Sequence, residues 1–171
     1  MRRFAFIAPL AATLAFAAAT QAEPARQPVP NPPTVTVSIG GDLLKDAEKL
    51  GQRDVELQLA DLTRSVEREL ARSGALPGAQ INLVVTDLKP NRPTMQQAID
   101  RPGLSIQDSV SIGGATIEGE VVTADGQHLP VRYSRYSNSI ADVFGYTTWS
   151  DAGTAFDRLA GNLSRGRLVS R

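Results

Sequence analysis

The spacing of apolar residues changes at Asp54, and this change limits the folds that are open to the chain. Residues 34–39 alternate valine and isoleucine with threonine and serine, which is typical of a strand with one buried face. From Val55 to Leu70, apolar residues instead recur at steps of three and four, as on one face of an amphipathic helix. Alternation returns at residues 81–85. The chain is therefore predicted to form a strand, a long helix and a second strand in this order.

The ends of the long helix carry signals of their own. The Asp54 side chain is expected to cap the first amide groups, and Gly74 with Pro77-Gly78 is expected to end the helix. The apolar stripe of this helix consists of Val55, Leu59, Leu62, Val66 and Leu70. Before it, the segment from Leu43 to Leu50 is compatible with a short helical turn.

The segment from Leu88 to Asp108 shows no regular pattern and contains three prolines. Loops longer than about 12–15 residues are uncommon in compact domains and are often functional. This segment is therefore the first place to expect a site. Strand patterns return at Ser109 to Ile112 and, after Gly113-Gly114, from Ile117 to Thr123.

A hairpin is predicted after this strand, because Asp125-Gly126 is a strong turn signal. A three-residue loop over residues 125–127 would pair Val121 with Val131 and would keep matching side chains on one face. Pro130 cannot donate a ladder hydrogen bond, so the returning strand is expected at an edge of the sheet.

The chain ends in a second amphipathic helix, whose apolar stripe consists of Trp149, Ala152, Phe156, Leu159 and Leu163. Thr148 followed by Asp151 is predicted to cap this helix, and Gly166 to end it. Together these elements predict a single α+β domain over residues 34–171, in the order β-α-β-β-β-α. In this two-layer sandwich, a sheet of about four antiparallel or mixed strands carries both amphipathic helices on one face.

The N-terminus has the pattern of a secretory signal peptide. Arg2 and Arg3 precede an apolar run that ends in small residues before Glu23, so residues 1–22 are predicted to be removed after export. The run is shorter than the roughly 20 residues that a membrane span needs, and no stable membrane insertion is expected after cleavage. Residues 23–33 contain five prolines and are predicted to be an extended linker.

The composition indicates in which cellular compartment the protein works and which classes of partner it is expected to bind. The chain has no cysteine, whereas an exported eukaryotic domain of this size usually carries disulfides, so a periplasmic or secreted location in a Gram-negative bacterium is favoured. Without Arg2 and Arg3, the chain has 16 basic and 18 acidic residues. This balance does not favour a nucleic-acid partner.

No arrangement of residues reaches the standard of a catalytic or cofactor site, and we expect no enzyme activity and no cofactor. His128 is the sole histidine and lies beside the predicted hairpin turn, with no nucleophile elbow around any serine. One histidine and no cysteine also argue against zinc and copper. The alternative is a cell-wall glycan hydrolase that uses Glu118 and Glu120, which occupy neighbouring positions on the same face of a strand.

The densest aromatic and cationic cluster is formed by Tyr133, Arg135 and Tyr136. With Asn91 and Arg92 of the long loop, these residues are the candidate contacts for a peptide, a glycan or an envelope protein, because arginine and tyrosine are favoured at interface hot spots. An exposed hairpin edge could also add a strand from a partner. A solvated edge strand with Tyr133 buried is the competing interpretation.

The order of these features resembles a group of bacterial envelope proteins, many of them lipoproteins, that share a domain of unknown function. The likeness rests on the segments Val85-Thr86-Asp87-Leu88-Lys89-Pro90-Asn91, Ser111-Ile112-Gly113-Gly114-Ala115 and Trp149-Ser150-Asp151-Ala152. It implies a periplasmic α+β accessory domain, although this chain lacks the lipidated cysteine common in the group. We therefore expect an exported, soluble binding or assembly module, with a glycan hydrolase or a purely structural envelope protein as alternatives.

Overall fold

The computed structural model describes residues 31–170, so the predicted signal peptide and residues 23–30 of the predicted linker lie outside the described part. The described chain forms an α+β domain around one mixed sheet in the order β1-β2-β3-β4-β5. The strands are β1 (Thr34–Ile39), β2 (Gln80–Lys89), β3 (Gly114–Val122), β4 (His128–Tyr136) and β5 (Val169–Ser170). The helices are α1 (Leu43–Leu50), α2 (Gln52–Ser73), α3 (Met95–Asp100), the 3-10 turn η1 (Ile140–Val143) and α4 (Ser150–Leu163).

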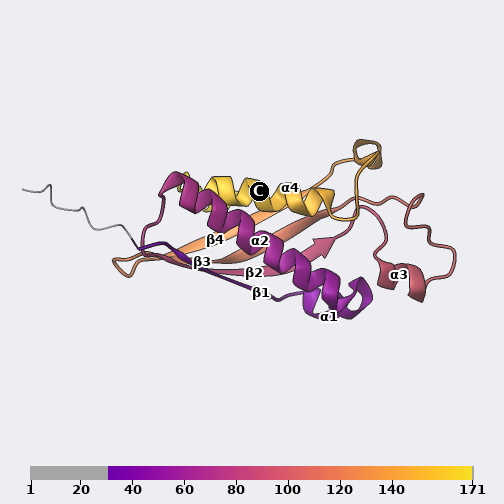
Figure 1. Ribbon diagram of the computed structural model, residues 1–171, viewed down its shortest axis with the longest axis horizontal. Coiled ribbons are helices and arrows are strands. Elements are labelled where there is room, and N and C mark those ends of the chain that lie inside the picture. The colour runs from indigo at the N-terminus through magenta and orange to yellow at the C-terminus, as the bar shows by residue number, and fades with distance from the viewer. Residues whose placement is uncertain (1–30, 171) are drawn as a thin grey trace, which may run out of the picture.

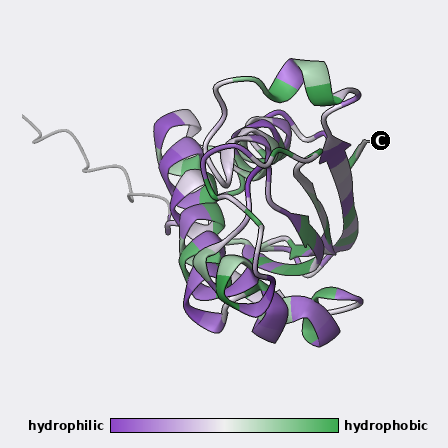
Figure 2. Ribbon diagram, turned by 90° about the vertical axis from the view of Figure 1, so that its right-hand side faces the viewer, coloured by the Kyte–Doolittle hydropathy of each residue, from purple (hydrophilic) through white to green (hydrophobic). Residues whose placement is uncertain are grey.

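The predicted two-layer architecture is confirmed. Helices α2 and α4 lie side by side over one face of the sheet, and Figures 1 and 2 show the helical layer and the sheet as separate layers. β1 and β2 are parallel, β2, β3 and β4 are antiparallel, and β5 is parallel to β4. No helix within residues 31–170 is long and apolar enough to cross a membrane.

The core lies between the two layers. Side chains at alternate positions of β2, β3 and β4 face the helices and are buried, including Ile81, Leu83, Ile117 and Val131. On α2, four of the five predicted stripe residues are buried, but Leu59 is only partly buried and Gln58 is buried beside it. The helical period of 3.6 residues explains this difference, because positions 58 and 59 lie on either side of the stripe.

The predicted end of α2 is confirmed, but its predicted cap is wrong. Gly74 adopts the left-handed conformation with φ 67° and donates its backbone N–H to the carbonyl of Leu70. The helix begins two residues before Asp54, immediately after Gly51, and the residue at its N-cap makes no side-chain capping bond. Gly51, with φ 93°, lets the chain turn sharply between α1 and α2, so the helix starts where the turn allows it.

The long segment after β2 contains a helix that its prolines obscure. Thr94 and Gln97 form a reciprocal capping box that starts α3, with the Thr94 hydroxyl accepting from the Gln97 amide at 3.2 Å. The predicted strand at Ser109 to Ile112 is wrong. Ser111 bonds instead to the loop after β2, with its amide on the Asn91 carbonyl at 2.8 Å.

The hairpin has the predicted faces but a different register. Val121 pairs with Leu129 rather than with Val131, a shift of two residues that keeps every side chain on its predicted face. The Thr123 hydroxyl accepts from the Gln127 amide at 3.1 Å and the Thr123 amide donates to the Gln127 carbonyl at 3.0 Å. These two bonds close the loop one residue earlier than predicted.

The edge of the hairpin is only partly exposed. β5 pairs in parallel with Arg132 and Tyr133 of β4, which leaves the stretch around Pro130 as the edge, as the proline predicts. At the other side of the sheet, β1 pairs with β2 alone among the described strands. The prediction of a free hairpin edge therefore holds for only part of β4.

Candidate functional site

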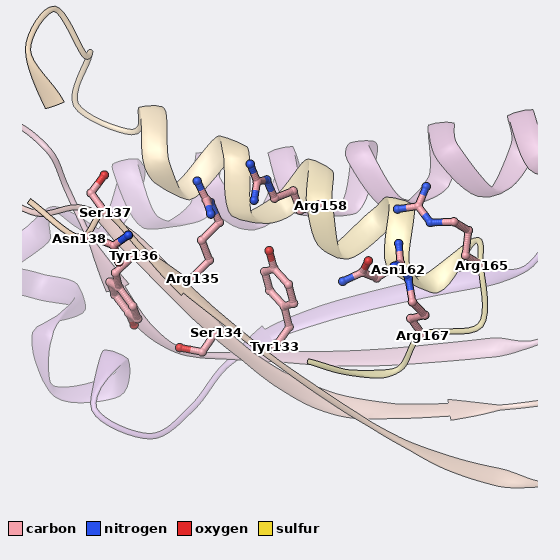
Figure 3. Close-up of a pocket in the computed structure, with 10 residues that line it drawn as sticks. All are labelled: Tyr133, Ser134, Arg135, Tyr136, Ser137, Asn138, Arg158, Asn162, Arg165 and Arg167. Carbon is pink, nitrogen blue, oxygen red and sulfur yellow. The ribbon is translucent and has the colours of Figure 1, made fainter. Parts of the chain in front are cut away.

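A pocket of about 650 Å³ opens between β4 and the C-terminal half of α4. Figure 3 shows side chains of β4 directed toward α4, and further side chains carried by the helix and by the segment after it. The pocket is lined by Tyr133, Ser134, Arg135, Tyr136, Ser137, Asn138, Arg158, Asn162, Arg165 and Arg167. Its volume lies within the range of about 300–1,000 Å³ that is usual for small-molecule sites.

Four arginines give this pocket its character: Arg135, Arg158, Arg165 and Arg167. No aspartate or glutamate is among the residues that line it. The chain as a whole has equal numbers of basic and acidic residues, so the positive charge is a property of this place and not of the protein. A concentration of guanidinium groups without acidic partners favours an anionic ligand.

The local sequence explains how the arginines meet. On β4, alternation sends Tyr133 and Arg135 toward the helical layer. On α4, Arg158 and Asn162 are four residues apart and so lie on one face of the helix. The carbonyl of Asn162 then accepts the amides of both Arg165 and Arg167, at 3.1 and 2.9 Å, which folds the chain after α4 back along the pocket.

Arg135 is the least exposed of the four arginines. Its Nε atom is buried and has no hydrogen-bond partner among the described residues. A buried donor left unsatisfied costs about 1–3 kcal/mol, and more when it belongs to a charged group.

Tyr133 adds a neutral donor beside the guanidinium groups. Its side chain is only 6% exposed, and Figure 3 shows its hydroxyl directed toward α4 and Arg158. Burial raises the pKa of Tyr133, while the charges of Arg135 and Arg158 act in the opposite direction. The phenol therefore stays protonated at neutral pH and can donate to an anion.

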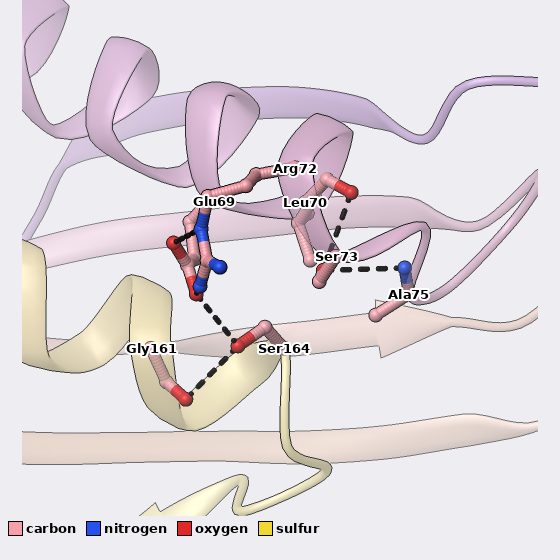
Figure 4. A network of polar contacts seen from close by, with 7 residues as sticks. All are labelled: Glu69, Leu70, Arg72, Ser73, Ala75, Gly161 and Ser164. Atoms are coloured by element: carbon pink, nitrogen blue, oxygen red, sulfur yellow. Dashed lines mark hydrogen bonds and ion pairs between the residues drawn. The ribbon is translucent and has the colours of Figure 1, made fainter.

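The opposite end of the pocket is held by contacts between α2 and α4, shown in Figure 4. Ser164 donates to the Glu69 carboxylate at 3.1 Å, and Arg72 donates to the same carboxylate at 2.6 and 2.9 Å. The hydrogen bond from Arg72 is the main cause that lowers the pKa of Glu69, and the charge of Arg165 contributes least. Glu69 therefore has Arg72 as its main cationic partner, and Arg165 interacts with it more weakly.

Gly161 leaves the space that the Arg165 side chain occupies. A Cβ atom at this position would lie 3.0 Å from Nη2 of Arg165. Any larger residue here would move the guanidinium group, so the position of Arg165 depends on a glycine inside a helix.

The structure divides the residues predicted from the sequence into two groups. Tyr133, Arg135 and Tyr136 all line the pocket. The Tyr136 ring, however, points to the open face of the sheet, where its hydroxyl donates to Asp87 at 2.6 Å and bonds Thr116 at 2.8 Å. Only Tyr133 and Arg135 therefore direct their side chains toward the helix.

Asn91 and Arg92 do not line the pocket. The Asn91 side chain is fully buried and bonds Asp151 at the start of α4. Arg92 donates to the carbonyl of Tyr146 at 2.5 Å and to that of Gln107. Both residues hold the loops around them, and neither is brought together with Tyr133 and Arg135.

Sequence reasoning missed Arg158, Arg165 and Arg167, which form most of the basic wall. The available signal was the pair Arg165-Gly166-Arg167 directly after a helix, with Arg158 two turns earlier. These arginines form a site only because β4 packs against α4 and brings Arg135 close to them.

A second pocket, of about 520 Å³, lies between α2 and the start of α4. Its charges are paired, since Arg68 lies 3.5 Å from Asp157 and Arg64 bonds Asp61. It therefore has no comparable preference for an anion.

The carboxylates of the alternative hydrolase lie on the open face of the sheet. The side chains of Glu118 and Glu120 are 47% and 44% exposed, and each has a separate partner, Arg132 at 3.4 Å for Glu118 and the His128 ring at 3.1 Å for Glu120. The hydrogen bond from His128 lowers the pKa of Glu120. A general acid needs the opposite shift, because it must hold its proton near neutral pH.

No cluster of three or more metal-ligating side chains occurs within residues 31–170. No protein-family model and no curated protein sequence matches this chain. The pocket between β4 and α4 is therefore the feature from which a function can be inferred.

Proposed function

We propose that this chain is an exported binding module of the bacterial cell envelope, and that it recognises its ligand or partner through an anionic group in the pocket between β4 and α4. The observation that carries the proposal is the group of four arginines around one pocket that no aspartate or glutamate lines. The chain's N-terminal pattern supports the export step.

The physical basis of binding is the positive charge of the arginines together with the hydrogen-bond donors of their guanidinium groups. Arginine presents a planar fork of donors that matches carboxylate and phosphate oxygens. Three of the four arginines are exposed at the rim, where they attract an anion at long range, and Arg135 is partly buried at the base. An anion that reached the base would meet the Arg135 guanidinium group between β4 and α4.

This proposal accounts for more of the observed geometry than its two alternatives. A glycan hydrolase would need a carboxyl group with a raised pKa, whereas Glu120 has a lowered one. A purely structural role would not explain why four arginines line one pocket that no aspartate or glutamate lines, since like charges in one place repel each other.

The test is titration of the isotopically labelled, exported protein with inorganic phosphate, followed by NMR chemical shifts. We expect saturable shifts confined to β4 and the end of α4, weakened as salt is added. The double variant Arg135→Gln/Arg158→Gln should lose them. Arg53→Gln serves as the matched control, since it removes the same kind of charge from an exposed position on α2 that does not line the pocket.

Two results would contradict the proposal. One is the absence of saturable shifts in the native protein. The other is an equal loss of binding in the Arg53→Gln control, because binding would then depend on net charge and not on the pocket.

A further inference from the structure

We infer that two copies of this chain form a two-fold symmetric dimer in which β1 of one copy pairs antiparallel with β1 of the other, centred on Val37. β1 lies at one edge of the sheet, and β4 with β5 lies at the other edge, as Figure 1 and the strand order show. The dimer would therefore leave the pocket between β4 and α4 open in both copies, and neither site depends on the other.

The outer side of β1 carries backbone groups that no described strand pairs. The amides of Thr34 and Gly40 both donate toward the β2 side of the strand, to carbonyls at 2.9 Å. Successive residues of a strand direct their backbone groups to opposite sides. The amides and carbonyls of Val35, Val37 and Ile39 therefore point away from β2 and are available to another strand.

This edge lacks the sequence features that usually keep an exposed strand from pairing with another chain. Proteins protect such edges with charged residues, proline, bulges or a covering segment. β1 has the sequence TVTVSI, and its register with β2 is regular over all six residues. At the other edge, β4 carries Pro130 and is covered by β5 at Arg132 and Tyr133. This contrast indicates that β1 pairs with a further strand when the protein functions.

The strand is complementary to itself when two copies run antiparallel. With the two-fold axis at Val37, Val35 lies opposite Ile39 of the second copy, and Thr36 lies opposite Ser38 of the second copy. The outward-pointing residues then form the hydrogen-bonded pairs of an antiparallel ladder. Apolar side chains that are only partly buried in one copy meet on the helical side, and exposed hydroxyls meet on the open face. No charge on β1 opposes this pairing.

A second feature matches the same axis. An apolar hollow of about 460 Å³ lies at the N-terminal end of β1, and Pro33, Leu70 and Pro77 are among the residues that line it. Leu44 follows the C-terminal end of β1 and is 61% exposed, which is unusual for a leucine. Antiparallel pairing places the C-terminal end of one β1 beside the N-terminal end of the other, so each copy brings Leu44 toward its partner's hollow. This reciprocity favours a second copy over an unrelated partner strand.

The experiment measures dimerisation of the exported protein by sedimentation velocity over a range of concentrations. We expect the native protein to dimerise. Thr36→Lys/Ser38→Lys would place like charges opposite each other on both sides of the axis, whereas Thr36→Lys/Ser38→Glu would place opposite charges there. The lysine–glutamate variant is the matched control and should dimerise at least tenfold more tightly than the lysine–lysine variant. Both positions are exposed, so the two variants place the same demands on folding.

Leu44→Ala should also weaken the dimer. Leu57→Ala serves as its control, because Leu57 is 49% exposed on α2 and does not line the hollow. An equal effect of the two substitutions on dimerisation would contradict the contact between Leu44 and the partner's hollow.

Cysteine cross-linking tests the register, since the chain has no cysteine of its own. A mixture of Thr36→Cys and Ser38→Cys chains should form disulfide-linked dimers faster than either variant alone, because only the mixture brings two cysteines opposite each other. Faster cross-linking of either variant with itself would overturn the axis at Val37.

Two further results would overturn the dimer at this edge. One is a native protein that stays monomeric throughout the concentration range. The other is equal dimerisation of the two charge variants, because the copies would then associate through another surface. Both results leave the anion-binding function standing, since the phosphate titration measures that function at the other edge of the sheet.

Discussion

Asn91 and Asp151 bond each other twice across 60 residues of sequence. The Asn91 amide nitrogen donates to the Asp151 carboxylate at 2.6 Å, and the Asn91 amide oxygen accepts from the Asp151 backbone at 2.9 Å. Ser137, at the end of the hairpin, donates to the same carboxylate at 2.6 Å. This pair therefore joins the exit of β2, the exit of β4 and the first turn of α4, which forms one wall of the candidate site.

Asn91→Ala should destabilise the domain by at least about 2 kcal/mol, because it leaves a buried carboxylate without one of its donors. Chemical unfolding at pH 7 measures the change. Asn138→Ala is the matched control, since Asn138 is exposed in the same region and should change the free energy of unfolding by less than about 0.5 kcal/mol. Similar losses for the two variants would show that Asn91 does not hold these segments together.

Gly113→Ala should destabilise the domain through Asn91. A Cβ atom at Gly113 would lie 2.6 Å from three atoms of the Asn91 amide, which is held by its bonds to Asp151 and is not free to move. In an Asn91→Ala background the same substitution should cost much less, because the obstructing group is gone. Strictly additive losses in the double variant would contradict this coupling.

Gly161→Ala should weaken ligand binding without lowering the free energy of unfolding. Replacing glycine within a helix by alanine gains roughly 0.5–1 kcal/mol, and the only close neighbour of the added methyl group is the far end of the Arg165 side chain. We therefore expect unchanged or increased stability but weaker binding of inorganic phosphate. Gly153→Ala, on the same helix with nothing within 4 Å, should leave the affinity unchanged.

Stability should fall as the pH rises above about 10. Burial is the first cause that raises the pKa of both Tyr133 and Tyr136, and for Tyr136 the bond to Asp87 adds to it. An unfolded tyrosine loses its proton near pH 10, before these two do in the native state, so deprotonation favours unfolding above that pH and has no such effect below it. Guanidinium unfolding at pH 9.5 and 11 should show a smaller loss in Tyr133→Phe/Tyr136→Phe than in the native protein. An identical loss would rule out these two groups as the cause.

Export should release a chain that begins at Glu23. The predicted cleavage follows Ala22, and N-terminal sequencing of the tagged protein from the periplasmic fraction of a Gram-negative host tests it. Replacing Ala22 by a bulky residue should block processing at this position. Retention of the full-length native chain in the membrane fraction would instead indicate an uncleaved anchor.

The sequence by itself determined the elements that depend on local spacing. Alternation at residues 34–39 and the steps of three and four along α2 and α4 identify buried faces, because the periods of strand and helix are set by backbone geometry. Together they also predict the α+β class and both helices on one face of the sheet. The bounds of β1 and the glycine end of α2 follow from the same local rules.

The hairpin register and the site became known only from the tertiary structure. Both hairpin registers place the same side chains inward, so the apolar pattern does not distinguish them. The observed register is the one in which the Thr123 hydroxyl accepts from the Gln127 amide and closes the loop. Asn91 looks like an exposed loop residue in sequence and is buried because Asp151 reaches it from the far end of the chain. The arginine pocket depends on β4 and α4 lying side by side, a long-range contact that no local pattern of residues specifies.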